Sequence, residues 1–219
     1  LNEQAAEKIY AAKGRPSDNP LIVHIAGMED LPRIAEIIPE EAKIVAEKFW
    51  PGPLTMIFDK TGIVPYETTG GLNTVAVRMP SSDIARELIR AGGGFIAAPS
   101  ANTSGRPSPT MAQHVEEDLN GKIDMILDGG TVEIGVESTI LDMTVTPPML
   151  LRPGAVTKEM LEELIGPIAV DAASISADSS KPPKAPGMKY RHYAPKADLS
   201  IVEGPVELVI EAINGMAAE

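Results

Sequence analysis

The alternation of apolar and polar positions along the chain predicts a mixed α/β fold. Short apolar runs predict strands, and apolar residues spaced three and four apart predict the helices between them. The expected strands are 21–25, 54–58, 74–79, 95–98, 123–127, 137–142 and 149–152, and the expected helices are 2–13, 28–38, 39–49, 81–91, 109–119 and 157–165. Alternating elements with a hairpin near the end indicate α/β architecture with a twisted mixed sheet.

One expected strand, Thr74–Met79, carries chemistry on one of its faces. A period of two places Thr74 and Arg78 on one side, and Val75 and Val77 on the other. We therefore expect Thr74 and Arg78 to line the same side of the sheet. The alternative on pattern alone is the exposed face of a half-buried sheet.

The composition changes near the C-terminus and indicates two units. Residues 1–168 are predicted to form the main domain, 169–197 a linker, and 198–219 the first strand and helix of a second α/β unit. Residues 171–184 are rich in Ala, Ser, Pro and Asp, as linkers are, whereas Lys189–Tyr193 gathers two Tyr, an Arg and a His. Because Leu1 lies directly in a helical pattern and Glu219 follows a new helix, we expect further sequence at both ends.

Composition and charge exclude several classes of protein. The 219 residues contain no Cys, which rules out disulfides, thiol catalysis and Cys-based zinc sites, and fits a reducing compartment such as the cytoplasm. No apolar run approaches the roughly 20 residues of a membrane span. The net charge of −12 argues against a surface built mainly for nucleic acid. The three His residues show no metal-ligand spacing.

The stretch Phe95–Ser108 is the first candidate site. Its apolar start predicts a buried strand, and Pro99 ends that strand because it has no backbone N–H. Ser100, Asn102 and Ser108 then fall in one loop at the strand end, where ligands of α/β sheets bind. The alternative is helix capping, since Ser108 precedes Pro109 as an N-cap precedes a Pro at the first helical position.

Cations near loops and strand ends are conspicuous in such an acidic chain. They are Lys13, Arg15, Arg78, Arg106 and Arg152. Such a set suits anionic substrates, and phosphoryl or nucleotidyl transfer needs mainly positioning and charge stabilisation. For each cation taken singly, the alternative is an ordinary surface charge. His24 lies in an apolar strand, where a core histidine is the commoner case.

Several motifs, in their order along the chain, resemble the YrdC-type threonylcarbamoyl-AMP synthases. They are Lys13-Gly-Arg-Pro with Asn19-Pro-Leu-Ile-Val-His24, Phe49-Trp-Pro-Gly-Pro-Leu-Thr55, Ala98-Pro-Ser-Ala-Asn102-x-Ser-Gly, Glu137-Ser-Thr139 and Leu151-Arg-Pro-Gly154. The resemblance covers roughly residues 1–167. The segment 186–195 further resembles the interdomain linker of the long, two-domain form, so residues 198–219 would begin its smaller Rossmann-like domain.

The resemblance implies a reaction and its partners. L-threonine and bicarbonate would form N-carboxythreonine, whose carboxylate attacks the α-phosphate of ATP and expels pyrophosphate. The product, threonylcarbamoyl-AMP, would pass to a tRNA threonylcarbamoyl-transferase complex. Mg²⁺ is expected with ATP, although the sequence shows no dedicated carboxylate cage. Weak RNA binding by a local basic groove is also expected.

The same resemblance implies roles for individual residues. Lys13, Arg15, Ser100 and Asn102 would be catalytic. Nucleotide contacts would come from Arg15, Asn19, Thr74, Ser100, Ser108, Arg152, Tyr190 and His192. Threonine contacts would come from His24, Arg78, Ala98 and Ser138.

One departure and two alternatives accompany this interpretation. The strand that precedes Leu1 in the family, with a threonine-contacting Thr, is not in this sequence. The alternatives are an RNA-binding module and the YrdC-like domain of a hydrogenase-maturation carbamoyltransferase. Pyrophosphate release from ATP, with and without threonine and bicarbonate, distinguishes the synthase from both.

Overall fold

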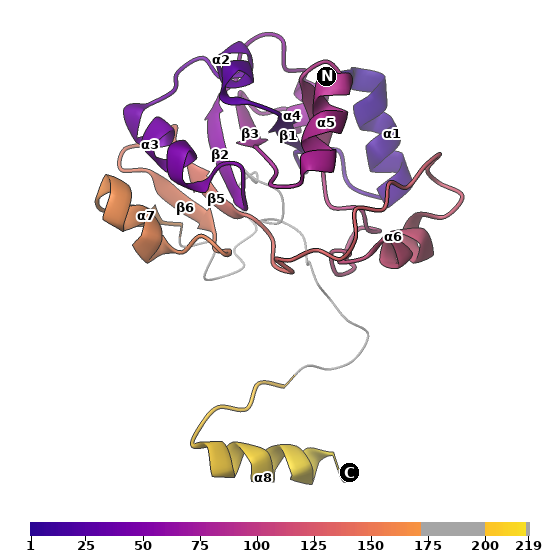
Figure 1. Ribbon diagram of the computed structural model, residues 1–219, viewed down its shortest axis with the longest axis vertical. Coiled ribbons are helices and arrows are strands. Elements are labelled where there is room, and N and C mark those ends of the chain that lie inside the picture. Colours follow the sequence, from indigo (N-terminus) through magenta and orange to yellow (C-terminus); the bar gives the residue numbers. More distant parts are fainter. Residues whose placement is uncertain (172–199, 218–219) are drawn as a thin grey trace.

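A seven-stranded mixed sheet forms the centre of the molecule (Figure 1). The computed structural model describes residues 1–171 and 200–217. The strands are β1 (Ile22–Ile25), β2 (Leu54–Asp59), β3 (Thr74–Arg78), β4 (Phe95–Ala98), β5 (Thr139–Asp142), β6 (Met149–Arg152) and β7 (Ala169–Val170), in the spatial order β4-β1-β3-β2-β5-β6-β7. Parallel pairs β1–β3, β2–β5 and β6–β7 alternate with the antiparallel pairs β1–β4, β2–β3 and β5–β6. The predicted mixed α/β fold is confirmed.

Helices and one short 3₁₀ segment connect the strands. They are α1 (Glu3–Lys13), η1 (Met28–Asp30), α2 (Leu31–Ile34), α3 (Glu40–Phe49), α4 (Tyr66–Thr69), α5 (Asp83–Ala91), α6 (Ala112–Leu119), α7 (Lys158–Ile165) and α8 (Val206–Met216). Asn2 caps α1 and Gly14 ends it in a left-handed conformation, with φ of 60°. Most of the predicted elements are confirmed to within a few residues, whereas α4 and β7 were not predicted.

Three predicted elements are wrong in length or kind. The helix expected over 28–38 ends at Ile34, because Ala35 turns extended and bridges Lys60 beside β2. Residues 123–127 form no strand, since no described strand lies beside them to complete the hydrogen-bond ladder. Residues 200–202 are likewise irregular, and the linker residues 172–199, which include Tyr190 and His192, lie outside the described residues.

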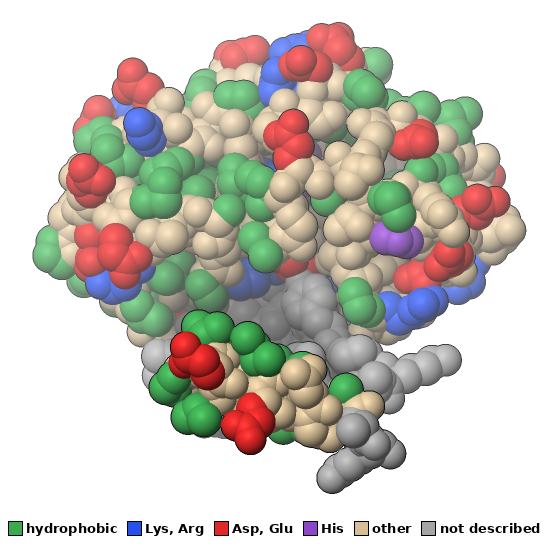
Figure 2. Space-filling view, turned by 60° about the horizontal axis from the view of Figure 1, so that its bottom comes forward, with side chains coloured by type: hydrophobic (Ala, Val, Ile, Leu, Met, Phe, Trp, Pro, Cys, Tyr) green, Lys and Arg blue, Asp and Glu red, His purple; other side chains and the backbone are tan. Residues whose placement is uncertain are grey.

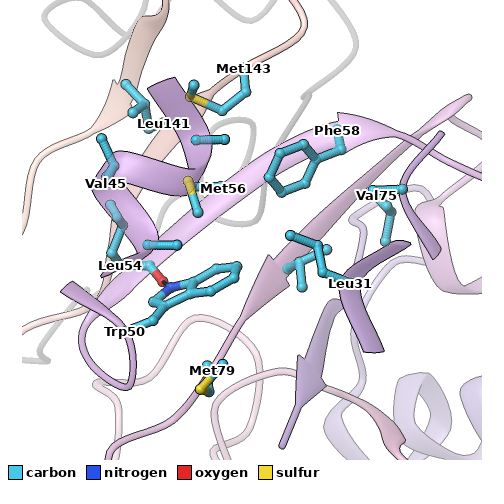
Figure 3. Close-up of a cluster of buried hydrophobic side chains, with 14 of the residues drawn as sticks. Leu31, Val45, Trp50, Leu54, Met56, Phe58, Val75, Met79, Leu141 and Met143 are labelled. Carbon is cyan, nitrogen blue, oxygen red and sulfur yellow. Dashed lines mark hydrogen bonds between the residues drawn. The ribbon is translucent and has the colours of Figure 1, made fainter. Parts of the chain in front are cut away.

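One face of the sheet carries the main hydrophobic core (Figure 3). Val75 and Val77 point into it together with Met56 and Phe58, and α2, α3 and α7 cover them. Trp50, at the end of α3, donates its indole Nε1–H to the Leu54 carbonyl at 2.7 Å, which satisfies its polar group inside the core. The sequence periodicity of β3 is therefore confirmed on this side.

The opposite face holds a smaller apolar cluster and several polar side chains. Ile22, Ile57, Ala76, Ile140 and Leu151 form that cluster. Because alternate residues of a strand point to opposite faces, Arg78 lies on this side with Ala76. The sheet thus separates a dry core from a polar face.

The C-terminal helix α8 exposes most of its apolar side chains. Val206, Leu208, Ile210, Ile213 and Met216 are each at least 51% exposed. Figure 2 shows hydrophobic surface, in green, along this helix. No helix among the described residues has the length and apolar character needed to cross a lipid bilayer.

Candidate active site

The register of the sheet places functional side chains in one row across its polar face. Backbone pairing aligns His24 with Arg78, Arg78 with Thr55, Thr55 with Ile140, and Ile140 with Arg152. Paired residues on neighbouring strands share a face, and each step between strands is about 4.8 Å, so three steps place the Cα atoms of Arg78 and Arg152 about 14 Å apart, with a register shift between β5 and β6 next to Ile140. Both side chains line one cavity, and the charge of Arg152 lowers the pKa of Arg78. Two cations on one cavity suit an anionic ligand.

The end of α1 supplies two further cations next to this row. Lys13 is only 4% exposed and donates from Nζ to the backbone carbonyls of Ser100 and Asn102. Arg15 is 8% exposed and donates to Asn19 Oδ1 at 2.7 Å and to the Pro20 carbonyl at 3.0 Å. Asn19 therefore orients the guanidinium of Arg15. Both cations are held in fixed positions before any ligand arrives.

The loop after β4 is folded around Lys13. Ser104 N donates to the Lys13 carbonyl at 2.9 Å, while the Asn102 side chain donates from Nδ2 to the carbonyls of Thr103 and Arg106, both at 2.9 Å. Asn102 Oδ1 is buried and has no hydrogen-bond partner among the described residues. An acceptor in that state can receive a donor from a bound ligand.

Asp118 in α6 fastens this loop from its other side. Its carboxylate, 6% exposed, accepts from Thr103 N at 3.0 Å and from the Arg106 guanidinium. Its backbone carbonyl accepts from the Thr103 hydroxyl at 3.2 Å. The loop that carries Ser100 and Asn102 is therefore hydrogen-bonded to Lys13 of α1 on one side and to Asp118 of α6 on the other.

A cavity of about 730 Å³ collects these groups. Ten of the predicted site residues line it: Lys13, Arg15, His24, Arg78, Ala98, Ser100, Asn102, Ser108, Ser138 and Arg152. Asn19 and Thr74 are not among its lining residues. Thr74 lies four positions from Arg78 along β3, about 13 Å of strand, and on the same side of the sheet. The nucleotide contacts of Asn19, Thr74, Tyr190 and His192 stay predictions.

Burial and like charges shift the protonation of the cavity groups. Burial, helped by Arg15, lowers the pKa of Lys13 to about 8. Burial, helped by Arg78, lowers the pKa of His24 to about 4, so its imidazole is neutral at pH 7. The pKa of Arg78 is lowered by burial first and then by Arg152. The cavity is thus a cluster of cations in a partly dry setting, where an anion is strongly attracted.

Glu137 brings a carboxylate into this cluster and reaches two predicted nucleotide residues. Ser108 Oγ donates to Glu137 Oε1 at 3.0 Å, and Arg152 Nη1 donates to Oε2. The helix-capping role of Ser108 is therefore wrong, because α6 begins only at Ala112, with Met111 as N-cap. Gly154 lets the chain after β6 pack against the backbone of Glu137, since a Cβ there would lie 2.5 Å from the Glu137 carbonyl oxygen.

Three residues of the site were missed as functional candidates by sequence reasoning. They are Thr55, Asp118 and Glu137. Thr55 Oγ1 lies 2.8 Å from Ser138 Oγ, Asp118 accepts from Thr103 N, and Glu137 accepts from the Ser108 hydroxyl. Thr55 and Glu137 stand inside the motifs that carry the family resemblance, and that position was the available signal. Nothing in the helical pattern of 109–119 distinguishes Asp118 from its neighbouring carboxylates.

Comparison with known proteins finds two matching family models and several close sequence relatives. The family model named Sua5, YciO and YrdC, described as telomere recombination, matches residues 1–154, and one described as threonylcarbamoyl-AMP synthase, C-terminal domain, matches residues 156–217. A Pyrococcus abyssi protein named threonylcarbamoyl-AMP synthase is 54% identical over the whole chain, which covers 64% of that relative. A Bacillus subtilis protein of the same name is 53% identical over 97% of the chain, covering 61% of the relative.

A solved structure agrees with these sequence relatives. The crystal structure of P. abyssi Sua5 complexed with L-threonine has a TM-score of 0.95 and 54% identity, over 99% of this chain and 64% of that one. The chain therefore spans less than two thirds of the length of these relatives.

Proposed function

This chain belongs to the Sua5/YciO/YrdC family, and on that premise we propose that it forms the catalytic part of a threonylcarbamoyl-AMP synthase. In this proposal L-threonine, bicarbonate and ATP are its substrates, and threonylcarbamoyl-AMP and pyrophosphate its products. The observation that carries the proposal is the row of side chains from His24 through Arg78 to Arg152, beside the buried cations Lys13 and Arg15. Their chemistry suits a carboxylate at one end of the cavity and phosphates at the other.

The Arg78 end of the row is proposed to hold threonine. Arg78 donates Nε to the Gly52 carbonyl at 3.0 Å, which fixes the plane of its guanidinium and leaves the Nη groups to grip a carboxylate. The neutral His24 lies opposite Arg78 in the register. P. abyssi Sua5, at 54% identity, crystallised as a complex with L-threonine, and this supports the same ligand here.

The Lys13 end is proposed to hold the triphosphate. Lys13 and Arg15 would stabilise the charge that grows as the N-carboxythreonine carboxylate attacks the α-phosphate and pyrophosphate leaves. The hydroxyls of Ser100 and Ser108 would donate neutral hydrogen bonds to phosphate oxygens, whereas Asn102 Oδ1 would accept from a donor group of the substrate. Lys13 and Arg15 are fixed by backbone contacts, so little reorganisation is required during the reaction.

Mg²⁺ is proposed to enter with ATP rather than to occupy a site built by the protein. Among residues 1–171 and 200–217 no three His, Cys, Asp or Glu side chains cluster as metal ligands. Mg²⁺ commonly keeps several waters and binds through substrate phosphates and one or two carboxylates. When bound, it would neutralise part of the phosphate charge.

The finer features of organisation and partners complete the proposal. The match of residues 156–217 to the synthase C-terminal domain supports the long, two-domain form, and favours a synthase over a hydrogenase-maturation protein. The product would go to a tRNA threonylcarbamoyl-transferase complex in the cytoplasm. With a net charge of −12, direct RNA binding would be weak.

Pyrophosphate release by the full-length protein tests the proposal. ATP, threonine and bicarbonate together should release pyrophosphate, and omission of any one should reduce the rate to background. Mass spectrometry should detect threonylcarbamoyl-AMP. Release that is indifferent to threonine and bicarbonate, or no release at all, would refute the assignment.

A further inference from the structure

The carboxylate of Glu137 occupies the place of an anion in the cationic cavity. It accepts hydrogen bonds from Ser108 and Arg152, which the proposed function assigns to the nucleotide. Burial lowers the pKa of Lys13, Arg15 and Arg78, and the negative charge of Glu137 partly offsets that lowering at all three. A phosphate that enters the cavity meets donors that already have an acidic partner.

Arg152 is held in a way that permits exchange of this partner. Its Nε donates to the Ser138 carbonyl at 3.0 Å, and its Nη2 donates to Ser138 Oγ at 3.1 Å. Thr55 in turn lies 2.8 Å from the same Ser138 hydroxyl. If Glu137 left Nη1, these contacts would keep the guanidinium in place and in the same plane.

We propose that Glu137 is a resident counter-anion that competes with the nucleotide for Arg152 and Ser108. In the empty cavity it neutralises and orients the cations, and a phosphate of the bound nucleotide displaces it from both donors. This role rests on the proposed function, because it requires nucleotide binding at Arg152. Glu137 is then a positioning residue that weakens ATP binding and keeps the empty site folded.

The direction in which ATP affinity changes distinguishes a competing carboxylate from one that only holds the site in shape, because loss of the former should strengthen ATP binding. Glu137→Gln keeps the shape of the side chain but loses its charge, and we expect ATP to bind about tenfold more tightly, because charge-assisted hydrogen bonds are roughly twice as strong as neutral ones. Adenosine, which has no phosphate to exchange with the carboxylate, should bind equally to both proteins. Glu137→Ala should change ATP affinity in the same direction and replaces the Gln variant should the latter not fold.

The experiment is calorimetric titration of the full-length protein with ATP and adenosine, with and without Mg²⁺. Glu117→Gln is the control, since Glu117 is an exposed carboxylate on α6 that does not line this cavity, and its loss should change ATP affinity less than about twofold, as surface charges are screened. Equal or weaker ATP binding by the Glu137 variants would overturn the inference, and so would a loss confined to Mg²⁺-containing samples, which would make Glu137 a ligand of the metal. No ATP binding by the unaltered protein would instead refute the proposed function.

Discussion

Asp118 gives the most direct test of how the loop after β4 is held. Its carboxylate is buried, with an exposed fraction of 6%, and accepts from the backbone of Thr103 at 3.0 Å and from Arg106. Asp118→Ala removes both acceptors from the loop that carries Ser100 and Asn102. It does not alter any residue assigned to the ligands.

The magnitude follows from the two contacts. Hydrogen bonds to charged groups contribute about 1.5–3 kcal/mol each, and loss of the acceptor leaves the Thr103 N–H unsatisfied. The Arg106 side chain is 59% exposed, so its ion pair adds only about 0–1 kcal/mol. We expect the free energy of unfolding to fall by about 2–3 kcal/mol, and Tm by roughly 5–10 °C.

Two assays measure separate consequences of this change. Thermal denaturation followed by circular dichroism gives the loss of stability. Pyrophosphate release gives kcat/KM for ATP, which should fall roughly ten- to hundredfold, because a shift of about 1 Å in positioning groups has that effect. Glu117→Ala is the control, since Glu117 is an exposed neighbour on the same helix and accepts from Gln113 at 3.1 Å. If the two variants lose the same stability and activity, the loop does not depend on Asp118.

Three further predictions concern the cations of the cavity. Arg78→Lys loses the two parallel donors of the guanidinium and should weaken threonine binding by about 1–3 kcal/mol, while ATP binding changes much less. Calorimetry measures both affinities, and equal losses for the two ligands would contradict the assignment of Arg78 to threonine. Because burial lowers the pKa of Lys13 to about 8, kcat/KM for ATP should fall above pH 8. In Lys13→Arg the side chain should stay charged, and kcat/KM should show no such fall up to about pH 10. An identical decline in both proteins would exclude Lys13 as the origin of the pH dependence. Between about pH 8 and 10.5, Lys13 binds fewer protons in the folded state than in the unfolded state, so its contribution should raise the free energy of unfolding over the range in which the activity falls. Denaturant titration at several pH values measures this change, and a free energy of unfolding that falls instead would contradict the prediction.

The sequence by itself determined the elements whose signals are local. The predicted helices 2–13 and 157–165 and the alternation in β3 depend on residues within a few positions of each other, and each is confirmed. In the structure Asn2 and Thr157 cap the two helices and Gly14 ends the first. Residues 123–127 have the composition of a strand, but a strand also needs a neighbour that no local pattern supplies. The end of α2 similarly depends on the contact between Ala35 and Lys60, which are far apart in the chain.

In the candidate site, too, the identity of the residues follows from the sequence, whereas their arrangement follows from the tertiary structure. Motifs identified ten residues that line one cavity, because side-chain chemistry and order along the chain are properties of sequence. Only the tertiary structure decided that β1, β3, β2, β5 and β6 lie in an order that aligns His24, Arg78, Thr55 and Arg152. It also decided that the Glu137 carboxylate, rather than a helix end, accepts a hydrogen bond from the Ser108 hydroxyl. Strand order and register arise from packing between distant segments, and for that reason the pairing of charges across the sheet could not be derived from local pattern.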